Sequence, residues 1–130
     1  MSAFEVASYF WKGFFFDEMH GESKYEFRQV KDEVEIVVQK AISKVIDGQE
    51  YDHIKANDCI QNVLKVCIDE LKQVSTNFKF IVTCHFQQRK GAALESHSSV
   101  YWDEDTDGSC VITWESSSLT AILYVYGLAL

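Results

Sequence analysis

The chain has 130 residues, of which 47% are hydrophobic and 14% aromatic, and it contains no proline. This composition excludes a disordered tail and a collagen-like repeat, and the length suits one globular domain. Twelve Lys and Arg stand against 20 Asp and Glu, and the resulting formal charge of −8 disfavours nucleic acid and anionic membranes as partners and favours a basic partner.

The first 22 residues are more aromatic than a solvated tail. Their aromatic side chains are Phe4, Tyr9, Phe10, Trp11, Phe14, Phe15 and Phe16. The apolar run at 14–16 is too short for a signal peptide or a membrane span, so neither secretion nor membrane insertion is predicted. We expect residues 1–22 to be an N-terminal extension that packs on its own domain or on a neighbouring subunit, and residues 23–130 to form one domain.

Two segments have the three- and four-residue apolar spacing of amphipathic helices. The first is expected to begin at a capping box formed by Ser23 and Glu26 and to end at Gly48. Its apolar positions are Phe27, Val30, Val34, Val37, Val38, Ala41 and Val45. The second has Asp52 or Asn57 as candidate caps. Its apolar positions are Ile60, Val63, Leu64, Cys67, Ile68, Leu71 and Val74.

After residue 77 the apolar period shortens to two residues, which predicts strands. The first strand begins at Phe78, and its apolar face consists of Phe78, Phe80, Val82, Cys84 and Phe86. Three further strands are expected at about 92–102, 109–115 and 119–127. Two helices followed by four strands predict an α+β domain in which the helices cover one face of an antiparallel sheet.

The last expected strand is apolar on both faces. One face carries Leu119, Ala121, Leu123 and Val125, and the other carries Ile122, Tyr124, Tyr126 and Leu128. Two helices can cover only one face of the sheet. We therefore expect the other face to pack against a second copy around a twofold axis, which predicts a homodimer.

The second expected strand, at 92–102, has serines and a histidine through its middle and no strong apolar face. Such a segment suits a sheet edge or an exchanged strand. Its backbone N–H and C=O groups would be free to pair with an extended peptide, which makes it the predicted binding element.

The C-terminal half closely resembles the Tctex-type dynein light chain family. The motifs that carry the resemblance are Phe78-Lys79-Phe80-Ile81-Val82-Thr83-Cys84, Gly91-Ala92, Trp102-Asp103, Thr106-Asp107-Gly108-Ser109-Cys110, Trp114-Glu115 and Tyr126-Gly127-Leu128. The similarity spans about 30–130. It implies two helices on a four-stranded sheet and a dimer formed by exchange of the second strand.

The resemblance also implies a role as a non-catalytic subunit of the dynein motor, in the cytoplasm and cytoskeleton. Such a subunit binds an extended segment of the dynein intermediate chain, or a cargo peptide, by strand addition. The residues implied to face the peptide are Leu94, Glu95, Ser96, His97, Ser98, Ser99 and Val100. Homodimer and heterodimer with a related light chain stay open, as do cytoplasmic dynein and the dynein of the cilium axoneme. The alternatives are an adaptor that works without dynein and, less favoured, a calcium-binding protein.

The calcium alternative comes from residues 103–108, which match the first six positions of an EF-hand loop. Calcium needs a bidentate carboxylate at the twelfth position, which is Trp114 here. The flanking segments are also strand-like instead of helical. An acidic connecting loop is therefore favoured over a calcium site.

The spacing of the cysteines does not predict a metal site or a redox site. Cys59, Cys67, Cys84 and Cys110 form no CxxC pair, so mostly buried free thiols in a reducing cytosol are expected. Cys84 and His85 are adjacent in a strand, and their side chains point to opposite faces, which disfavours a nucleophile and base. No nucleotide-binding or hydrolase motif occurs. We expect no catalytic residue, metal ligand or cofactor.

Overall fold

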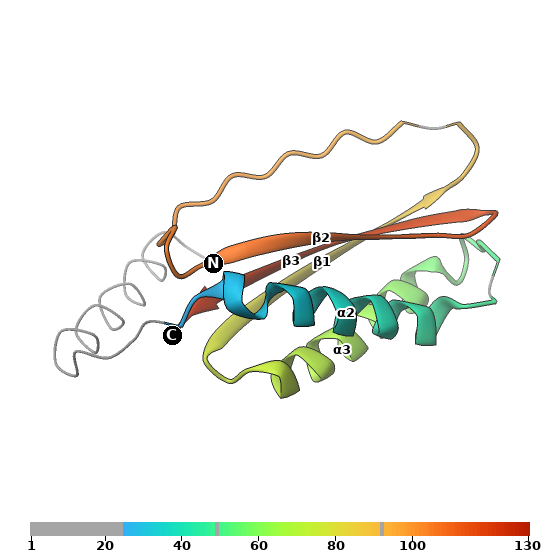
Figure 1. Cartoon of the computed structure of the whole chain (residues 1–130). Helices are drawn as coiled ribbons and strands as arrows, with labels where there is room; N and C mark the ends of the chain where they lie inside the picture. The colour runs from blue at the N-terminus through green and yellow to red at the C-terminus, as the bar shows by residue number, and fades with distance from the viewer. Residues whose placement is uncertain (1–24, 49, 92) are drawn as a thin grey trace, which may run out of the picture.

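The computed structural model describes residues 25–48, 50–91 and 93–130, and the extension predicted at 1–22 lies outside them. The elements, in chain order, are helices α2 (Phe27–Ile46) and α3 (Ala56–Val74) and strands β1 (Phe78–Gln88), β2 (Gly108–Glu115) and β3 (Leu119–Ala129). The strands form an antiparallel sheet in the order β1-β3-β2. Both helices lie on one face of this sheet (Figure 1). The predicted α+β class is therefore confirmed.

The core lies between the two helices and the inner face of the sheet. Helix α2 contributes Val34, Val38 and Ile42, and α3 contributes Val63, Cys67 and Leu71, all fully buried. From the sheet, the buried residues are Phe78, Cys110, Ile112, Leu119, Ala121, Leu123 and Val125. The remaining apolar residues of the inner face of β1 are half-buried against the same core. The predicted inner faces of β1 and β3 are thus confirmed, because burial follows the strand period. The predicted helix stripes are confirmed only in part. Ile42 and Ile46 of α2 are fully buried although the prediction left them out, and the predicted Ile60, Leu64 and Ile68 of α3 are only half-buried.

The helix N-termini differ from expectation. Helix α2 begins after Glu26, whose side chain makes no capping hydrogen bond, and Ser23 lies outside the described residues. The Phe27 amide instead donates to the Thr106 carbonyl oxygen at 2.8 Å. Helix α3 begins after Lys55, so the prediction that Asp52 or Asn57 caps it is wrong. Asp52 Oδ1 accepts from the Ile54 amide at 2.9 Å, which stabilises the turn before the helix.

The predicted second strand is wrong for the single chain, whose described sheet has three strands instead of four. Residues 93–101 belong to no strand, and all are exposed. They leave the end of β1 and run over the side of the sheet that faces away from the helices (Figure 1). The polar middle of this segment explains the difference, because it has no apolar face whose burial would hold it against its own domain.

Helix α2 contacts the sheet through the ring of its first residue, Phe27, which packs over two glycines. Gly108 of β2 and Gly127 of β3 are cross-strand partners, and the ring of Phe27 lies directly over both. Phe27 also packs edge-on against Phe78, with ring centroids 6.2 Å apart. A side chain at either glycine would occupy the space of the Phe27 ring, so this close approach requires glycine.

Candidate functional site

All seven residues predicted to face a peptide lie in one continuous exposed run, the arching segment, which we define as residues 93–101. Its larger apolar side chains are open to solvent, with Leu94 47%, Val100 49% and Tyr101 92% exposed. None of its residues forms a hydrogen bond with the described part of the chain. Its backbone donors and acceptors are therefore available to another strand.

The arching segment is held at both ends. Before it, the Arg89 amide donates to the Ser118 carbonyl oxygen at 2.9 Å, and Arg89 Nη1 donates to the Ser116 carbonyl oxygen at 2.7 Å. After it, the ring of Trp102 packs against Tyr126 of β3, with centroids 6.2 Å apart. These contacts fix where the segment leaves and rejoins the domain while its middle stays unpaired.

The acidic loop that follows, at residues 103–107, uses two of its carboxylates, those of Asp103 and Asp107, for hydrogen bonds within the domain. Asp107 Oδ1 accepts from the Ala129 amide at 2.8 Å, and Asp107 Oδ2 accepts from the Asp103 amide at 3.1 Å. Asp103 Oδ1 accepts from the Asp105 amide at 3.0 Å. Burial raises the pKa of Asp107, and the backbone hydrogen bonds oppose that rise. The carboxylate of Asp107 thus ties the loop to the end of β3.

Replacing Asp107 with alanine is expected to lower the free energy of unfolding by about 1 to 2 kcal/mol, because two backbone amides lose their acceptor. Urea unfolding at fixed protein concentration measures this change. Asp105→Ala is the matched control, since Asp105 is exposed and its role in the loop is a backbone amide that alanine retains. An Asp107→Ala midpoint equal to that of Asp105→Ala would contradict the assigned role.

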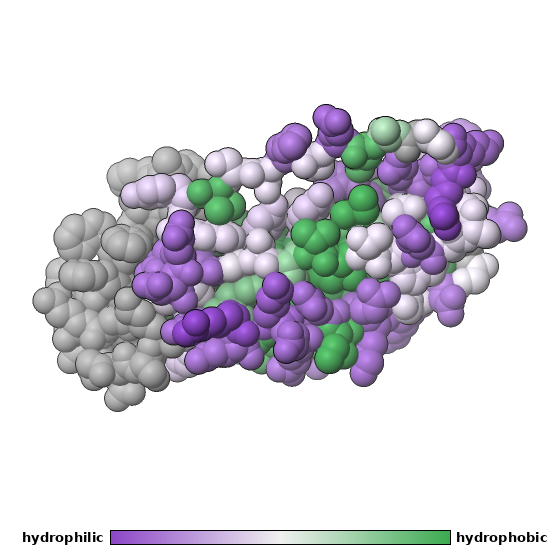
Figure 2. All heavy atoms as spheres, turned by 45° about the horizontal axis from the view of Figure 1, so that its top comes forward, coloured by the Kyte–Doolittle hydropathy of each residue, from purple (hydrophilic) through white to green (hydrophobic). Residues whose placement is uncertain are grey.

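The side of the sheet that faces away from the helices carries an apolar patch. Register places Ile81 opposite Tyr126, Val111 opposite Tyr124, and His85 opposite Ile122. We call this set of six residues the outer face. Figure 2 shows hydrophobic side chains gathered in the middle of the view, with polar side chains below them and toward the right. An apolar sheet face without a helix over it is typical of a contact surface.

Ile81 and Val111 are members of the outer face that sequence reasoning missed. Val111 lies between Cys110 and Ile112, which are both buried, and is itself 55% exposed. The alternation in Gly108–Glu115 was a usable signal, because a residue between two inward-facing neighbours must point outward.

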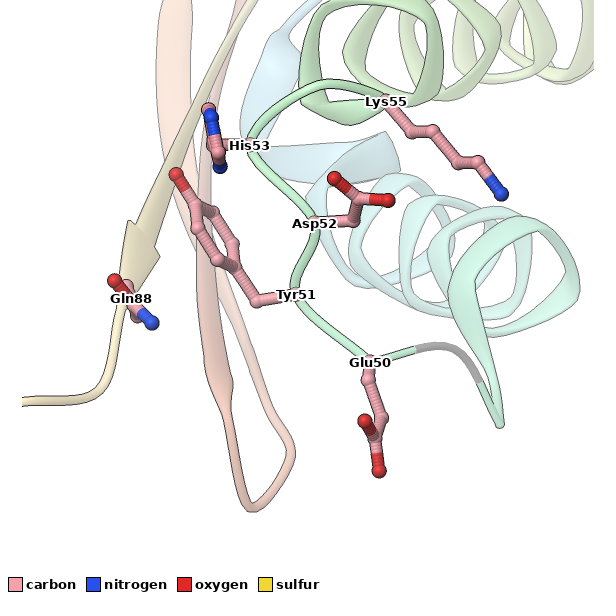
Figure 3. Close-up of a pocket in the computed structure, with 6 residues that line it drawn as sticks. All are labelled: Glu50, Tyr51, Asp52, His53, Lys55 and Gln88. Atoms are coloured by element: carbon pink, nitrogen blue, oxygen red, sulfur yellow. The ribbon is translucent and has the colours of Figure 1, made fainter.

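A pocket of about 830 Å³ lies at the junction of the α2–α3 connection and the end of β1. Its lining residues are Glu50, Tyr51, Asp52, His53, Lys55 and Gln88. Tyr51 and His53 point toward the strands, whereas Glu50 and Lys55 point away from them (Figure 3). The Tyr51 amide donates to Ser118 Oγ at 3.1 Å, which joins this connection to the β2–β3 turn. The charged groups do not converge on one point, so the pocket offers no evident acid–base pair.

The thiols are protonated in the folded chain at neutral pH. Burial raises the pKa of Cys67 and of Cys110 to about 11 and that of Cys84 to about 12, and it also raises the pKa of Cys59. A protonated thiol is a poor nucleophile and metal ligand. In the described ranges no group of three or more His, Cys, Asp or Glu side chains is arranged to hold a metal ion. Among the same residues, neither helix is long and apolar enough to cross a membrane.

Comparison with known proteins matches the chain to one family. The model of the Tctex-1 family matches residues 28–128. A Dynein light chain Tctex-type from Drosophila melanogaster is 37% identical over 108 residues, which cover 83% of this chain and 97% of that protein. Dynein light chain Tctex-type 3 from Homo sapiens is 26% identical over 99 residues, covering 76% of this chain and 85% of the relative. A Dynein light chain Tctex-type from Dictyostelium discoideum is 27% identical, covering 75% and 89%.

Proposed function

The chain belongs to the Tctex-1 family, and from this premise we propose that it is a non-catalytic light chain of a dynein motor that clamps an extended peptide as a dimer. The proposal of peptide clamping is supported by the arching segment, which is anchored at both ends and has an unpaired backbone between them. The names of the relatives support the dynein assignment.

The proposed dimer forms by exchange of the arching segment. Sheet order leaves β2 as an edge strand, with free backbone groups on the side away from β3. The arching segment, residues 93–101, is about as long as the eight-residue β2, so the segment of one copy can pair along β2 of the other. The two outer faces then cover each other, which removes their apolar side chains from water.

In this arrangement the peptide adds to the second edge of the exchanged segment. One edge of the segment pairs with β2 of the other copy, and the opposite edge stays open to an extended peptide. The formal charge of −8 and the neighbouring carboxylates of Glu95, Glu104 and Asp105 favour a basic peptide. Two grooves per dimer give avidity for a partner that is itself dimeric.

The proposed partner is the dynein intermediate chain or a cargo peptide, bound by a homodimer or by a heterodimer with a related light chain. The proposed location is the cytoplasm and cytoskeleton, including the cilium axoneme if the motor is axonemal. No bond is made or broken in this role. The subunit acts only by binding: it positions its partner, and the fraction bound follows from the affinity and the concentrations.

Ser98→Pro tests the binding element. Proline removes a backbone donor and cannot continue a paired strand, so the dissociation constant for an intermediate-chain peptide is expected to rise at least about tenfold. Ser98→Ala is the matched control, because it removes the hydroxyl and keeps the backbone amide. Isothermal titration calorimetry measures both variants. An unchanged dissociation constant in Ser98→Pro would place the peptide elsewhere on the molecule.

Affinity purification from the native cell tests the assignment to a motor. We expect the dynein heavy chain and intermediate chain to co-purify with the wild-type chain. Recovery of the same partners without any dynein heavy chain would instead favour an adaptor that works independently of the motor.

A further inference from the structure

A pocket of about 390 Å³ lies where the end of α3 meets the start of β1. Its apolar lining comes from Ile68 of α3 and from Phe78 and Phe80 of β1, and Lys72 and Lys79 add two positive charges. We call it the α3–β1 pocket. None of its lining residues belongs to the arching segment, to β2 or to the outer face, so it is separate from the surfaces of the proposed clamp.

The free edge of β1 lies beside this pocket. Asn77 and Arg89 flank β1, and each forms a backbone hydrogen bond with the residue opposite it, so the odd-numbered residues of β1 pair with β3 and the even-numbered ones direct their N–H and C=O groups to the free edge. Of the latter, Phe80, Val82 and Phe86 form no backbone hydrogen bond with another described residue, and their side chains are only half-buried. Native proteins cover such an apolar edge with a helix or a loop.

The chain that precedes the described residues begins next to this pocket. Tyr25 is the first described residue, and the ring of Phe27 packs against the ring of Phe78, which in turn lies 6.1 Å from that of Phe80. The starts of α2 and β1 accordingly lie at the same end of the domain (Figure 1). Residues 17–24 connect the aromatic run at 14–16 to Tyr25, and eight extended residues span up to about 28 Å. The aromatic run can therefore reach the pocket of its own chain.

Residues 1–22 match the α3–β1 pocket in both polarity and charge. They contain seven aromatic side chains, whose burial is favourable. Their charged side chains are the lysine at position 12 and four carboxylates, those of Glu5, Asp17, Glu18 and Glu22. The pocket lining has two lysines and no carboxylate. Lys72 Nζ lies 3.8 Å from Asp69 Oδ1, but both side chains are more than half exposed, and such a surface pair leaves the lysine free to attract further carboxylates.

We propose that residues 1–22 fold back onto the α3–β1 pocket of their own chain. The aromatic run at 14–16 packs against Ile68 and Phe80, and the neighbouring carboxylates lie near Lys72. The segment then also covers the free edge of β1. Because it is tethered next to the pocket, its effective concentration there is high, and a contact that is weak between separate molecules is filled within one chain. The inference does not depend on the dimer of the proposed function.

Urea unfolding of the full chain tests whether the aromatic run packs on the domain. Phe14→Ser/Phe15→Ser/Phe16→Ser changes only residues that precede α2, so the domain is expected to stay folded, as far-ultraviolet circular dichroism can check. Its urea midpoint is expected to fall by about 1 M at fixed protein concentration, which corresponds to the loss of one or two buried rings. An unchanged midpoint would overturn the inference.

A pair of isoleucines on α3 tests where the run packs. Ile68 lines the pocket, whereas Ile60 is also half-buried on α3 but lies two turns away from it. In an Ile68→Ser background the triple substitution is expected to lower the midpoint by less than half as much as in the wild type, because the two changes remove the same contact. In an Ile60→Ser background the full effect is expected. Equal effects in the two backgrounds would place the run elsewhere and overturn the inference.

Zero-length carbodiimide cross-linking tests whether the contact lies within one chain. Unlabelled and ¹⁵N-labelled full chains are mixed in equal amounts, and products that join Lys72 to Asp17 or Glu18 are analysed by mass spectrometry. Products within a single isotopic form are expected. Products that combine the two forms in the proportion of random pairing would assign the extension to a neighbouring subunit and overturn the inference, while leaving the proposed function standing.

Discussion

Val111→Asp is expected to raise the dissociation constant of the dimer by at least about 100-fold. Val111 lies on the outer face and is 55% exposed in the single chain, so a carboxylate there meets water and each chain stays folded. In the proposed dimer the same carboxylate would be buried without a partner, opposite Tyr124 and far from any cation of the described sheet. Sedimentation equilibrium measures the dissociation constant, and far-ultraviolet circular dichroism checks that the chain remains folded.

Ile36→Asp is the matched control for this prediction. Ile36 lies on α2, is exposed to the same 55%, and belongs to the helical side of the domain. Its replacement is expected to leave the dissociation constant within about threefold of the wild type, because the site does not enter the proposed contact. If Val111→Asp dimerised as tightly as Ile36→Asp, the outer face would not be the dimer interface.

Gly127→Val is expected to lower the free energy of unfolding by about 3 kcal/mol. An added Cβ on Gly127 would occupy the space of the Phe27 ring, which is buried between Gly108, Gly127 and Phe78. The ring cannot move without opening the contact between α2 and the sheet, and overpacking of this kind costs about 1–3 kcal/mol or more. Urea unfolding at fixed protein concentration measures the change, because a dimer makes apparent stability depend on concentration.

A double-mutant cycle separates this clash from other effects of valine. Phe27→Ala alone is expected to cost about 3–5 kcal/mol by leaving a cavity. In Phe27→Ala/Gly127→Val the valine enters that cavity, so the double variant is expected to be more stable than the sum of the single effects predicts. Strict additivity, or a wild-type midpoint for Gly127→Val, would show that the ring and the glycine do not compete for space.

Periodicity alone determined the helices, the inner faces of β1 and β3, and the α+β class. Val34 and Leu71 repeat with the helical period, and Leu123 and Val125 with the strand period, so burial of one side follows directly from spacing. The apolar outer side of the last strand could also be predicted from the spacing of its residues. The resemblance of the C-terminal motifs identified the family, which the match over residues 28–128 then confirmed.

The tertiary structure alone decided how the arching segment lies. Its residues have strand-like composition at both ends, yet a polar middle gains too little from burial to pair with its own sheet, so local pattern predicted a fourth strand that the single chain lacks. Two contacts between residues distant in sequence hold its ends. Arg89 donates a hydrogen bond to the β2–β3 turn, and the ring of Trp102 packs against Tyr126. The packing of the Phe27 ring over Gly108 and Gly127 is likewise a contact between residues distant in sequence. Spacing along a chain encodes which side of an element is buried, but which partner it meets depends on the packing of the whole domain.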